Sequence, residues 1–367
     1  MRRKLVLEVI LLITLILGSG VVLYRHFSAR KTPAEDTVKV FAYSESDPNV
    51  IGITSSNLAR AIWDSIDPLT KGRSSYKKGT IEEIAQKYSQ KEMGTRETPQ
   101  GLECMVLQRS TEGCDVFTFI PKKGFDKTIL YIHGGAYIMD IPESDFARMD
   151  EIAQRANARI IMPRYKTTFH GTYKEAYALF ASVYDSVLME QALDSNRDPS
   201  EKTYYETGVV TNLTIMGESA GGGLALGFVE YLNEEGLPLP QKMLLLCPWV
   251  DATMTNPGIP DYEERDILLG PYGLSYLGSL WADGLPLNDY HISPIYGDLS
   301  QKMPDSLIVT GTEEIMFPDV TLLYSKLRNA GHRTRLIIGE DNCHVFMKLN
   351  TPEAEETWKL IYEFLSE

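Results

Sequence analysis

The glycine-rich segment at residues 217–223, Gly-Glu-Ser-Ala-Gly-Gly-Gly, constrains the fold of this chain more than any other part of the sequence. It follows the apolar run Leu213–Met216 and precedes the helix-prone run Leu224–Val229, so we predict a sharp turn from a strand into a helix. Only residues without bulk fit two positions before and after the centre of such a turn, and glycine stands at both. The turn would point the hydroxyl of Ser219 outward, as a nucleophile needs, although a turn that merely connects two elements has the same pattern.

A second glycine pair lies upstream, where the predicted buried strand Lys127–Ile132 runs into the segment His133–Tyr137. Adjacent glycines let bare backbone approach a ligand. In acyl transfer, the N–H groups of Gly134 and Gly135 can donate to the same developing oxyanion as the N–H of Ala220, which the turn places at a helix N-terminus. Each such donor stabilises the transition state by about 3 kcal/mol. The two segments together favour an oxyanion hole over a plain turn at a strand end.

The general base is expected after the last strand of such a sheet, and His344 follows the predicted strand Thr334–Gly339. The apolar Phe346, two positions on, can anchor the loop while the imidazole points toward the nucleophile. His133 is interpreted as a structural hydrogen-bonding residue beside the oxyanion loop. The remaining histidines are assigned to membrane-flanking, solvated or supporting positions: His26, His170, His291 and His332.

The acid that orients the base is expected after the predicted strand Ser306–Gly311, where three carboxylates follow. Glu314 is the preferred candidate, because it stands close enough to the strand end to hang from its tip. Asp319 stands where the next helix begins, so it also reads as a helix N-cap and remains the alternative acid. Glu313 is expected to be solvated. The chain order serine, acid, histidine is the order of the α/β-hydrolase arrangement.

Five segments together resemble those of the hormone-sensitive-lipase group of α/β-hydrolase esterases, over roughly residues 45 to 367. They are His133–Tyr137, Gly217–Gly222, Ser293–Leu299, Gly311–Met316 and His344–Phe346. The resemblance implies an α/β fold with a mostly parallel central sheet, helices on both faces and a helical cap. It implies a carboxylic ester hydrolase that needs no cofactor and no metal. The residues it implies are Ser219 as nucleophile, Glu314 as acid, His344 as base, and the N–H groups of Gly134, Gly135 and Ala220 as oxyanion hole.

The chain departs from the pattern of this family at three places. Ala136 replaces the third glycine of the oxyanion motif, which the family tolerates. The acid is often aspartate in the family, and the extra methylene of Glu314 demands a different reach. The segment Pro163–Phe169 replaces the usual Asp-Tyr-Arg-Leu-Ala-Pro-Glu, so the pocket wall built there in the family is not carried over.

The N-terminus is predicted to be a membrane anchor or signal segment at residues 1–28. Basic residues precede the apolar run Leu5–Tyr24, which is long enough to span a bilayer. The preferred interpretation is a single-pass anchor in the cell membrane with the catalytic domain outside the cytoplasm. The alternative is cleavage near Gly18–Gly20 and secretion. Residues 29–50 are expected to form a polar tether.

Residues 51–367 are predicted to form the catalytic domain, with cap elements from 51–100 and 251–305. Two or three helices are expected between Ile51 and Lys91. A hairpin of Leu102–Leu107 and Val116–Pro121 is expected to open the sheet, after which strands alternate with helices. An apolar cap of this size suits a small or medium acyl ester as substrate.

Composition excludes some classes of protein and leaves others open. A formal net charge of −14, without a basic stripe, argues against nucleic acid as a partner. The four cysteines lack the spacing of metal ligands and are expected to be free buried thiols. Two alternatives remain besides an esterase, namely a non-catalytic binding protein on the same scaffold and a peptidase or amidase. The sequence does not indicate an oligomeric state.

Overall fold

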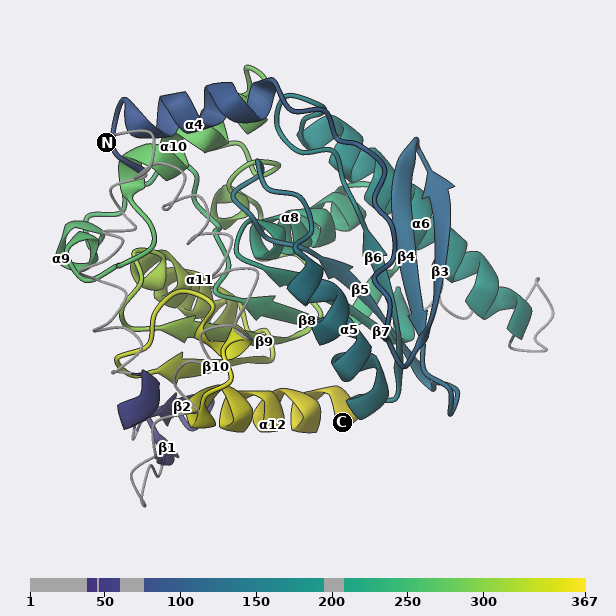
Figure 1. Ribbon diagram of the computed structural model, residues 1–367. Coiled ribbons are helices and arrows are strands. Elements are labelled where there is room, and N and C mark those ends of the chain that lie inside the picture. Colours follow the sequence, from purple (N-terminus) through teal and green to yellow (C-terminus); the bar gives the residue numbers. More distant parts are fainter. Residues whose placement is uncertain (1–37, 45, 60–75, 195–207) are drawn as a thin grey trace.

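The computed structural model describes residues 38–44, 46–59, 76–194 and 208–367 (Figure 1). The predicted N-terminal anchor at 1–28 lies outside these ranges. Within them, no helix combines the length and the apolar character needed to cross a bilayer.

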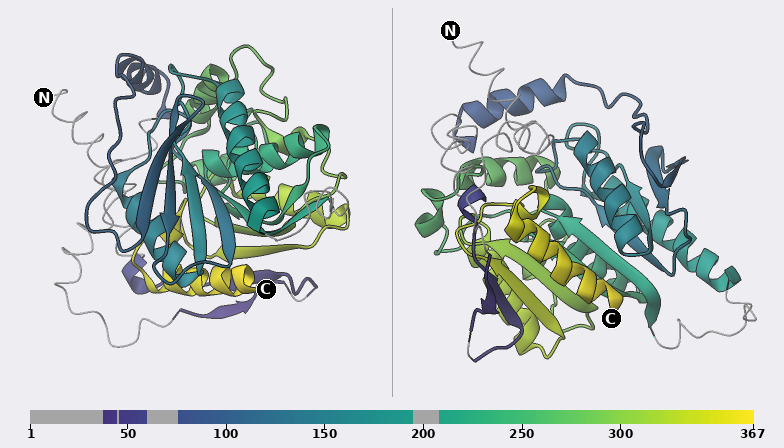
Figure 2. Two further views of the ribbon diagram at one scale, coloured as in Figure 1. Left: turned by 90° about the vertical axis from the view of Figure 1, so that its right-hand side faces the viewer. Right: turned by 60° about the horizontal axis from the view of Figure 1, so that its bottom comes forward.

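The core is a single ten-stranded sheet in the order β1-β2-β10-β9-β8-β7-β5-β6-β4-β3 (Figures 1 and 2). The strands from β2 to β6 in this order run parallel. Among the described strands, antiparallel pairs occur only at the edges, between β1 and β2, β4 and β6, and β3 and β4. The predicted mostly parallel sheet is therefore confirmed. The strands are β1 Val40–Ala42, β2 Val50–Ile53, β3 Met105–Thr111, β4 Cys114–Ile120, β5 Lys127–Ile132, β6 Ala158–Pro163, β7 Val209–Glu218, β8 Leu239–Leu246, β9 Asp305–Gly311 and β10 Thr334–Gly339.

Helices cover both faces of this sheet (Figure 2). Buried side chains of α5 and α12 belong to one apolar cluster, and those of α4, α6, α8, α10 and α11 belong to the other. The described helices are α4 Thr80–Ser89, α5 Glu143–Arg155, α6 Tyr173–Asp194, α8 Ala220–Glu234, α9 Pro260–Glu263, α10 Pro271–Trp281, α11 Phe317–Asn329 and α12 Pro352–Ser366, with short 3-10 turns η2 Pro294–Tyr296 and η3 Phe346–Lys348.

The central strands are apolar on both faces, which is why they appear as continuous hydrophobic runs in the sequence. In β8, Leu244 packs into the cluster beneath α5 and α12, and its neighbour Leu245 packs into the opposite cluster. Ile337 and Ile338 of β10 divide between the two clusters in the same way. A parallel strand placed between two helical layers needs this alternation of buried side chains on both sides.

The prediction for residues 29–50 and for the start of the next segment was wrong in part. Val40–Ala42 is not tether but edge strand β1, and Val50–Ile53 is strand β2, not the beginning of a helix. Val50–Ile53 pairs in parallel with β10, and the side chain of Ile53 is fully buried. This strand has only four residues, and besides the nearby β1 it pairs with β10, nearly 290 residues away, so little in the local sequence separates it from the helical pattern expected next.

The predicted hairpin is present, but its strands reach further toward the turn than expected. β3 and β4 pair from Met105 with Ile120 to Thr111 with Cys114, and the turn consists of Glu112 and Gly113 alone. Both turn residues have positive φ, 49° and 69°, as a two-residue hairpin turn of the primed type requires. Cys104, Cys114, Cys247 and Cys343 are all buried and free.

A buried carboxyl group on α8 predicts a dependence of stability on pH. Glu230 is 6% exposed, and neither of its carboxylate oxygens has a hydrogen-bond partner among the described residues. Burial, with a further contribution from Asp298, raises its pKa to about 9, against an opposing effect of Lys326. The folded state therefore holds this proton more tightly than the unfolded state, so the stability it contributes below pH 4.5 is lost as pH rises toward 9.

Replacing Glu230 with glutamine should flatten this dependence. Between pH 5 and 9, the free energy of unfolding of the natural chain should fall as pH rises. Its slope should be steeper than that of Glu230→Gln by up to roughly 1.4 kcal/mol per pH unit. Urea unfolding at several pH values measures both slopes. Glu235→Gln, one turn on and exposed, is the matched control and should keep the natural slope. Equal slopes for Glu230→Gln and the natural chain would contradict the prediction.

Candidate active site

Ser219 stands at the turn between β7 and α8 with φ 54° and ψ −122°, a backbone conformation that is strained for a residue with a side chain. The turn is tight because the chain packs on itself. A Cβ atom at Gly217 would lie 2.1 Å from the carbonyl oxygen of Gly221, and one at Gly221 would lie 2.2 Å from that of Ile132. The amide of Ser219 donates to the carbonyl of Leu246 at 2.9 Å, which fixes the turn against β8.

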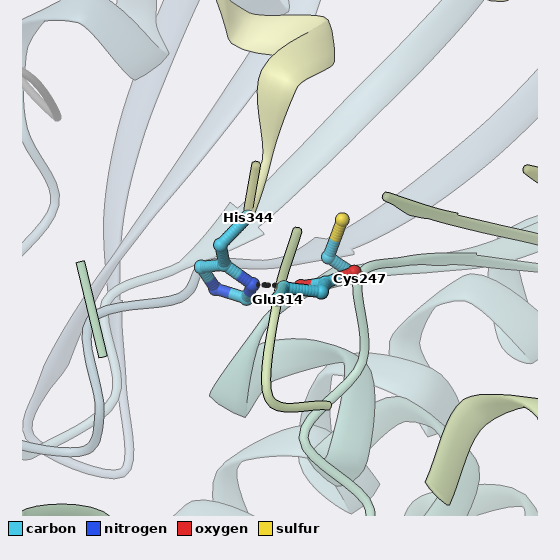
Figure 3. A group of neighbouring side chains, drawn as sticks. All are labelled: Cys247, Glu314 and His344. Atoms are coloured by element: carbon cyan, nitrogen blue, oxygen red, sulfur yellow. Dashed lines mark hydrogen bonds and ion pairs between the residues drawn. The ribbon is translucent and has the colours of Figure 1, made fainter. Parts of the chain in front are cut away.

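The structure brings Ser219, His344 and Glu314 into one hydrogen-bonded series. Nε2 of His344 lies 2.9 Å from Oγ of Ser219, and Nδ1 lies 2.5 Å from Oε2 of Glu314. Figure 3 shows the ring of His344 directed at the carboxylate of Glu314. The three side chains come from the carboxyl ends of β7, β10 and β9, where loops of a parallel sheet converge. All three are almost inaccessible, with exposures of 8%, 4% and 0%.

Glu314 is held from its other side as well. Its Oε1 accepts from the hydroxyl of Thr310 at 2.5 Å and from the amide of Gly311 at 3.0 Å. Burial raises the pKa of Glu314, but the charge of His344 and these hydrogen bonds outweigh burial and lower it overall. Burial likewise lowers the pKa of His344, but the charge and hydrogen bond of Glu314 outweigh it and raise this pKa overall. The pair therefore favours a carboxylate that stabilises an imidazolium.

The structure places the two other candidate carboxylates elsewhere. Asp319 is the third residue of α11, whose N-cap is Met316, so the predicted N-cap position was wrong. Its carboxylate accepts from the side-chain amide of Asn256 at 2.7 Å, and burial raises its pKa to about 7. It lines a separate groove beside α11. Glu313 forms an ion pair with Arg265 near the surface.

The glycine pair after β5 lies directly beside the serine. A Cβ atom at Gly134 would lie 3.1 Å from Cβ of Ser219, and Gly135 has φ 112°, which favours glycine. Among the described residues, none accepts a hydrogen bond from the amides of Gly134, Gly135 or Ala220. His133 is buried, with Nδ1 2.8 Å from the carbonyl oxygen of Gly134, and its ring stacks on Tyr165. In the described part of the chain these three N–H donors have no acceptor, and Gly134 and Gly135 line the same pocket as Ser219.

Sequence reasoning missed Asp266, a buried carboxylate that ties the loop before α10 to the backbone beside Glu314. Its Oδ1 accepts from the amides of Leu268 and Leu269, and its Oδ2 accepts from the amide of Ile315 at 2.9 Å. The local turn has a signal in the sequence, because aspartate commonly accepts from amides two and three residues on. The bond to Ile315, next to Glu314, spans 49 positions and has none.

Ser219 and His344 line a pocket with a mixed wall. Both predicted cap regions contribute to it. Region 51–100 contributes Tyr76, and region 251–305 contributes the loop before α10 and α10 itself. Its apolar lining is Tyr76, Ala136, Met139, Pro142, Leu268, Leu269, Leu274 and Val345, and its charged lining is Asp140, Asp145, Glu218 and Lys348. The pocket can therefore hold a ligand that carries both an apolar group and polar groups.

One cluster of potential metal-ligating side chains occurs in the described part of the chain. The ligand atoms of Cys247, Glu314 and His344 lie within 4.8 Å of one another (Figure 3). The sulfur of Cys247 accepts from the amide of Val345 at 3.3 Å, and burial, with the nearby Glu314, raises the thiol pKa well above its usual range. The hydrogen bond between Glu314 and His344 accounts for this grouping without a metal ion.

The sheet, the turn and the hydrogen-bonded series define an α/β hydrolase. A family model described as the alpha/beta hydrolase fold matches residues 129–348, more than half of the chain, and the chain belongs to this family. The fold and the family expected from the motifs are thereby confirmed.

Individual relatives agree with this assignment. An acetyl-hydrolase of Streptomyces hygroscopicus is 26% identical over 58% of this chain and 65% of its own length. A Staphylococcus aureus protein of solved structure is 26% identical with a TM-score of 0.70, covering 79% of this chain and 94% of its own. A hormone-sensitive lipase from a metagenome library, 24% identical with a TM-score of 0.67 over 84% and 98%, shares the fold. The chain spans less than two thirds of the length of the first two curated relatives.

Proposed function

We propose that this chain is a serine-dependent carboxylic ester hydrolase that works through an acyl-enzyme. The observation that carries the proposal is the series in which Ser219, His344 and Glu314 follow one another at hydrogen-bond distance. Oγ of Ser219 attacks the ester carbonyl while Nε2 of His344 takes the hydroxyl proton. The tetrahedral intermediate collapses, and the alcohol leaves with the proton from Nε2. Water then repeats these steps on the acyl-enzyme and releases the acid.

The other residues of the site stabilise charge during these steps. The N–H groups of Gly134, Gly135 and Ala220 donate to the oxyanion of each tetrahedral intermediate. Glu314 keeps the proton of neutral His344 on Nδ1, which leaves Nε2 free to accept from the serine, and it stabilises the imidazolium. The fixed contacts of Glu314 with Thr310 and Gly311 support this role, because the carboxylate needs no rearrangement during the reaction.

The proposed substrates are small to medium acyl esters. The apolar lining of the pocket supports an apolar acyl or alcohol group, and the names of relatives support ester chemistry, since they include an acetyl-hydrolase and an esterase. A side-by-side assay of matched p-nitrophenyl esters and p-nitroanilides of rising acyl length tests this. We expect turnover of short and medium esters with little cleavage of anilides, because amide cleavage needs better protonation of the leaving group. Comparable rates on both would indicate a peptidase or amidase instead.

A membrane location through residues 1–28 is a separate proposal, supported by the basic start and the apolar run Leu5–Tyr24. Fractionation of cells that express the full chain should recover activity in the membrane pellet, resistant to alkaline wash and released by detergent. Added protease should reach the catalytic domain from outside. Activity in the medium would favour cleavage near Gly18–Gly20, and activity in the cytosolic fraction would contradict both interpretations.

A further inference from the structure

The wall of the catalytic pocket contains a lysine that the proposed mechanism does not use. Lys348 is the last residue of η3, four positions after His344, and its side chain is 12% exposed. Its Nζ lies 2.6 Å from Oδ1 of Asp145 and 3.1 Å from Oε1 of Glu218. Of the described residues that line this pocket, it is the only lysine or arginine.

The two carboxylates bound by Lys348 come from the elements that carry the rest of the site. Glu218 is the last residue of β7 and directly precedes Ser219. Asp145 lies in the first turn of α5, and its second oxygen accepts from the hydroxyl of Tyr131 in β5 at 3.2 Å. One ammonium group therefore connects the loop that carries His344 to Glu218 at the end of β7 and to Asp145 at the start of α5.

The backbone of Lys348 is held by a hydrogen bond as well, so both its main chain and its side chain have fixed partners. Nη2 of Arg148, in α5, donates to the carbonyl oxygen of Lys348 at 3.3 Å. Burial alone lowers the pKa of Lys348, but Asp145 and Glu218 outweigh it and raise the pKa above its usual value, so the ammonium is charged at neutral pH. Removing the ammonium group leaves two neighbouring buried carboxylates without a cation, and the segments that carry them must move to resolvate this charge.

We propose that Lys348 is a positioning residue for ester hydrolysis, which holds the loop of His344 at hydrogen-bond distance from Ser219 by binding Glu218 and Asp145 together. The inference rests on the proposed function. Lys348 acts through His344 and touches none of the reacting atoms in the proposed steps. Because a misplacement of about 1 Å in a catalytic pair costs about 100-fold in rate, loss of this link should lower the rate of reaction and leave the binding of an apolar ester nearly unchanged.

The test uses the full chain with Lys348→Met. We expect kcat to fall about 100-fold with KM within about threefold of the natural value. A fluorophosphonate should still label one serine per chain at the end point, but its second-order rate should fall in proportion to kcat/KM. Lys359→Met is the matched control, since Lys359 is an exposed lysine of α12 that pairs with Glu356 at the surface, and it should behave like the natural chain.

A second variant keeps the inference testable where Lys348→Met does not fold. Asp145→Asn leaves Lys348 and Glu218 paired and should lower kcat about tenfold, again with KM little changed. The double variant should be no slower than Lys348→Met, because both changes break one link. Natural rates in either single variant, or a loss of rate matched by an equal loss of end-point labelling, would overturn the inference. A natural chain that neither turns over esters nor takes the label would instead overturn the proposed function.

Discussion

Replacing Ser219 with alanine is expected to lower kcat for ester hydrolysis roughly 10⁶-fold, and His344→Ala should do the same. Each change removes one half of a single proton transfer, from the serine hydroxyl at 2.9 Å to Nε2 of the imidazole. The double variant should therefore lose little more than either single variant. Initial rates with a p-nitrophenyl ester, together with circular dichroism to confirm folding, measure the effect.

His332→Ala is the matched control for the histidine. Nε2 of His332 bonds the carbonyl oxygen of Leu299 at 2.8 Å, at the amino end of β10, so this variant should retain natural rates. Fluorophosphonate labelling adds an independent test, because the label should react with the natural chain and not with Ser219→Ala. Natural rates in either active-site variant would refute the assignment. A natural chain without turnover or labelling would favour a non-catalytic binding protein on the hydrolase scaffold.

The parts of the site that could be predicted are those with a local cause. The turn at Ser219 follows from the glycines that flank it, because any Cβ there would collide with backbone within 2.2 Å. The loop after β5 follows from Gly134, where a Cβ atom would lie 2.9 Å from the carbonyl oxygen of Glu218, and from Gly135, whose φ of 112° favours glycine. The placement of His344 follows from the order of strands, since the loops at the carboxyl ends of neighbouring parallel strands meet at one edge of a sheet.

The parts that could not be predicted depend on contacts between distant segments. The link from Asp266 to Ile315 and the pairing of Lys348 with Glu218, 130 residues apart, appear only when the loops are placed in space. The strand Val50–Ile53 takes its place in the sheet by pairing with the distant β10 as well as with the short edge strand β1. The secondary-structure propensity of a segment depends on a few neighbouring residues. These features depend instead on tertiary packing, which overrides such local preferences.

The choice between Glu314 and Asp319 lies between these cases. Both stand shortly after β9. The sequence separates them only by their distance from the strand end, which favours Glu314, and by the helix start at Asp319, which suggests a capping role there. In the structure, the first turn of α11 directs Asp319 to Asn256, while Glu314 is turned to His344 by bonds from Thr310 and Gly311. The backbone after the strand therefore directs the two carboxylates to different partners.

Glu314→Gln is accordingly expected to lower kcat about 10⁴-fold, because a neutral amide neither stabilises the imidazolium nor keeps the proton of His344 on Nδ1. Asp319→Asn, the matched control, should change kcat by less than about threefold, since its carboxylate bonds only Asn256 among the described hydrogen bonds. Rates with one p-nitrophenyl ester for both variants decide between them. A larger loss in Asp319→Asn would move the acid to that position.

The pH profile of the residual activity supplies a second readout for the same variant. His344 faces three carboxylates, Glu314, Asp266 and Glu218, each of which raises its pKa, and the largest of these effects is that of Glu314. Without that charge, the largest of the effects that raise this pKa is lost, so the pKa of the imidazole falls. Since the base works only when unprotonated, the acid limb of kcat/KM should shift to lower pH in Glu314→Gln and stay in place in Asp319→Asn. An unshifted limb in Glu314→Gln would show that another group sets the charge of His344, and the acid would have to be sought again.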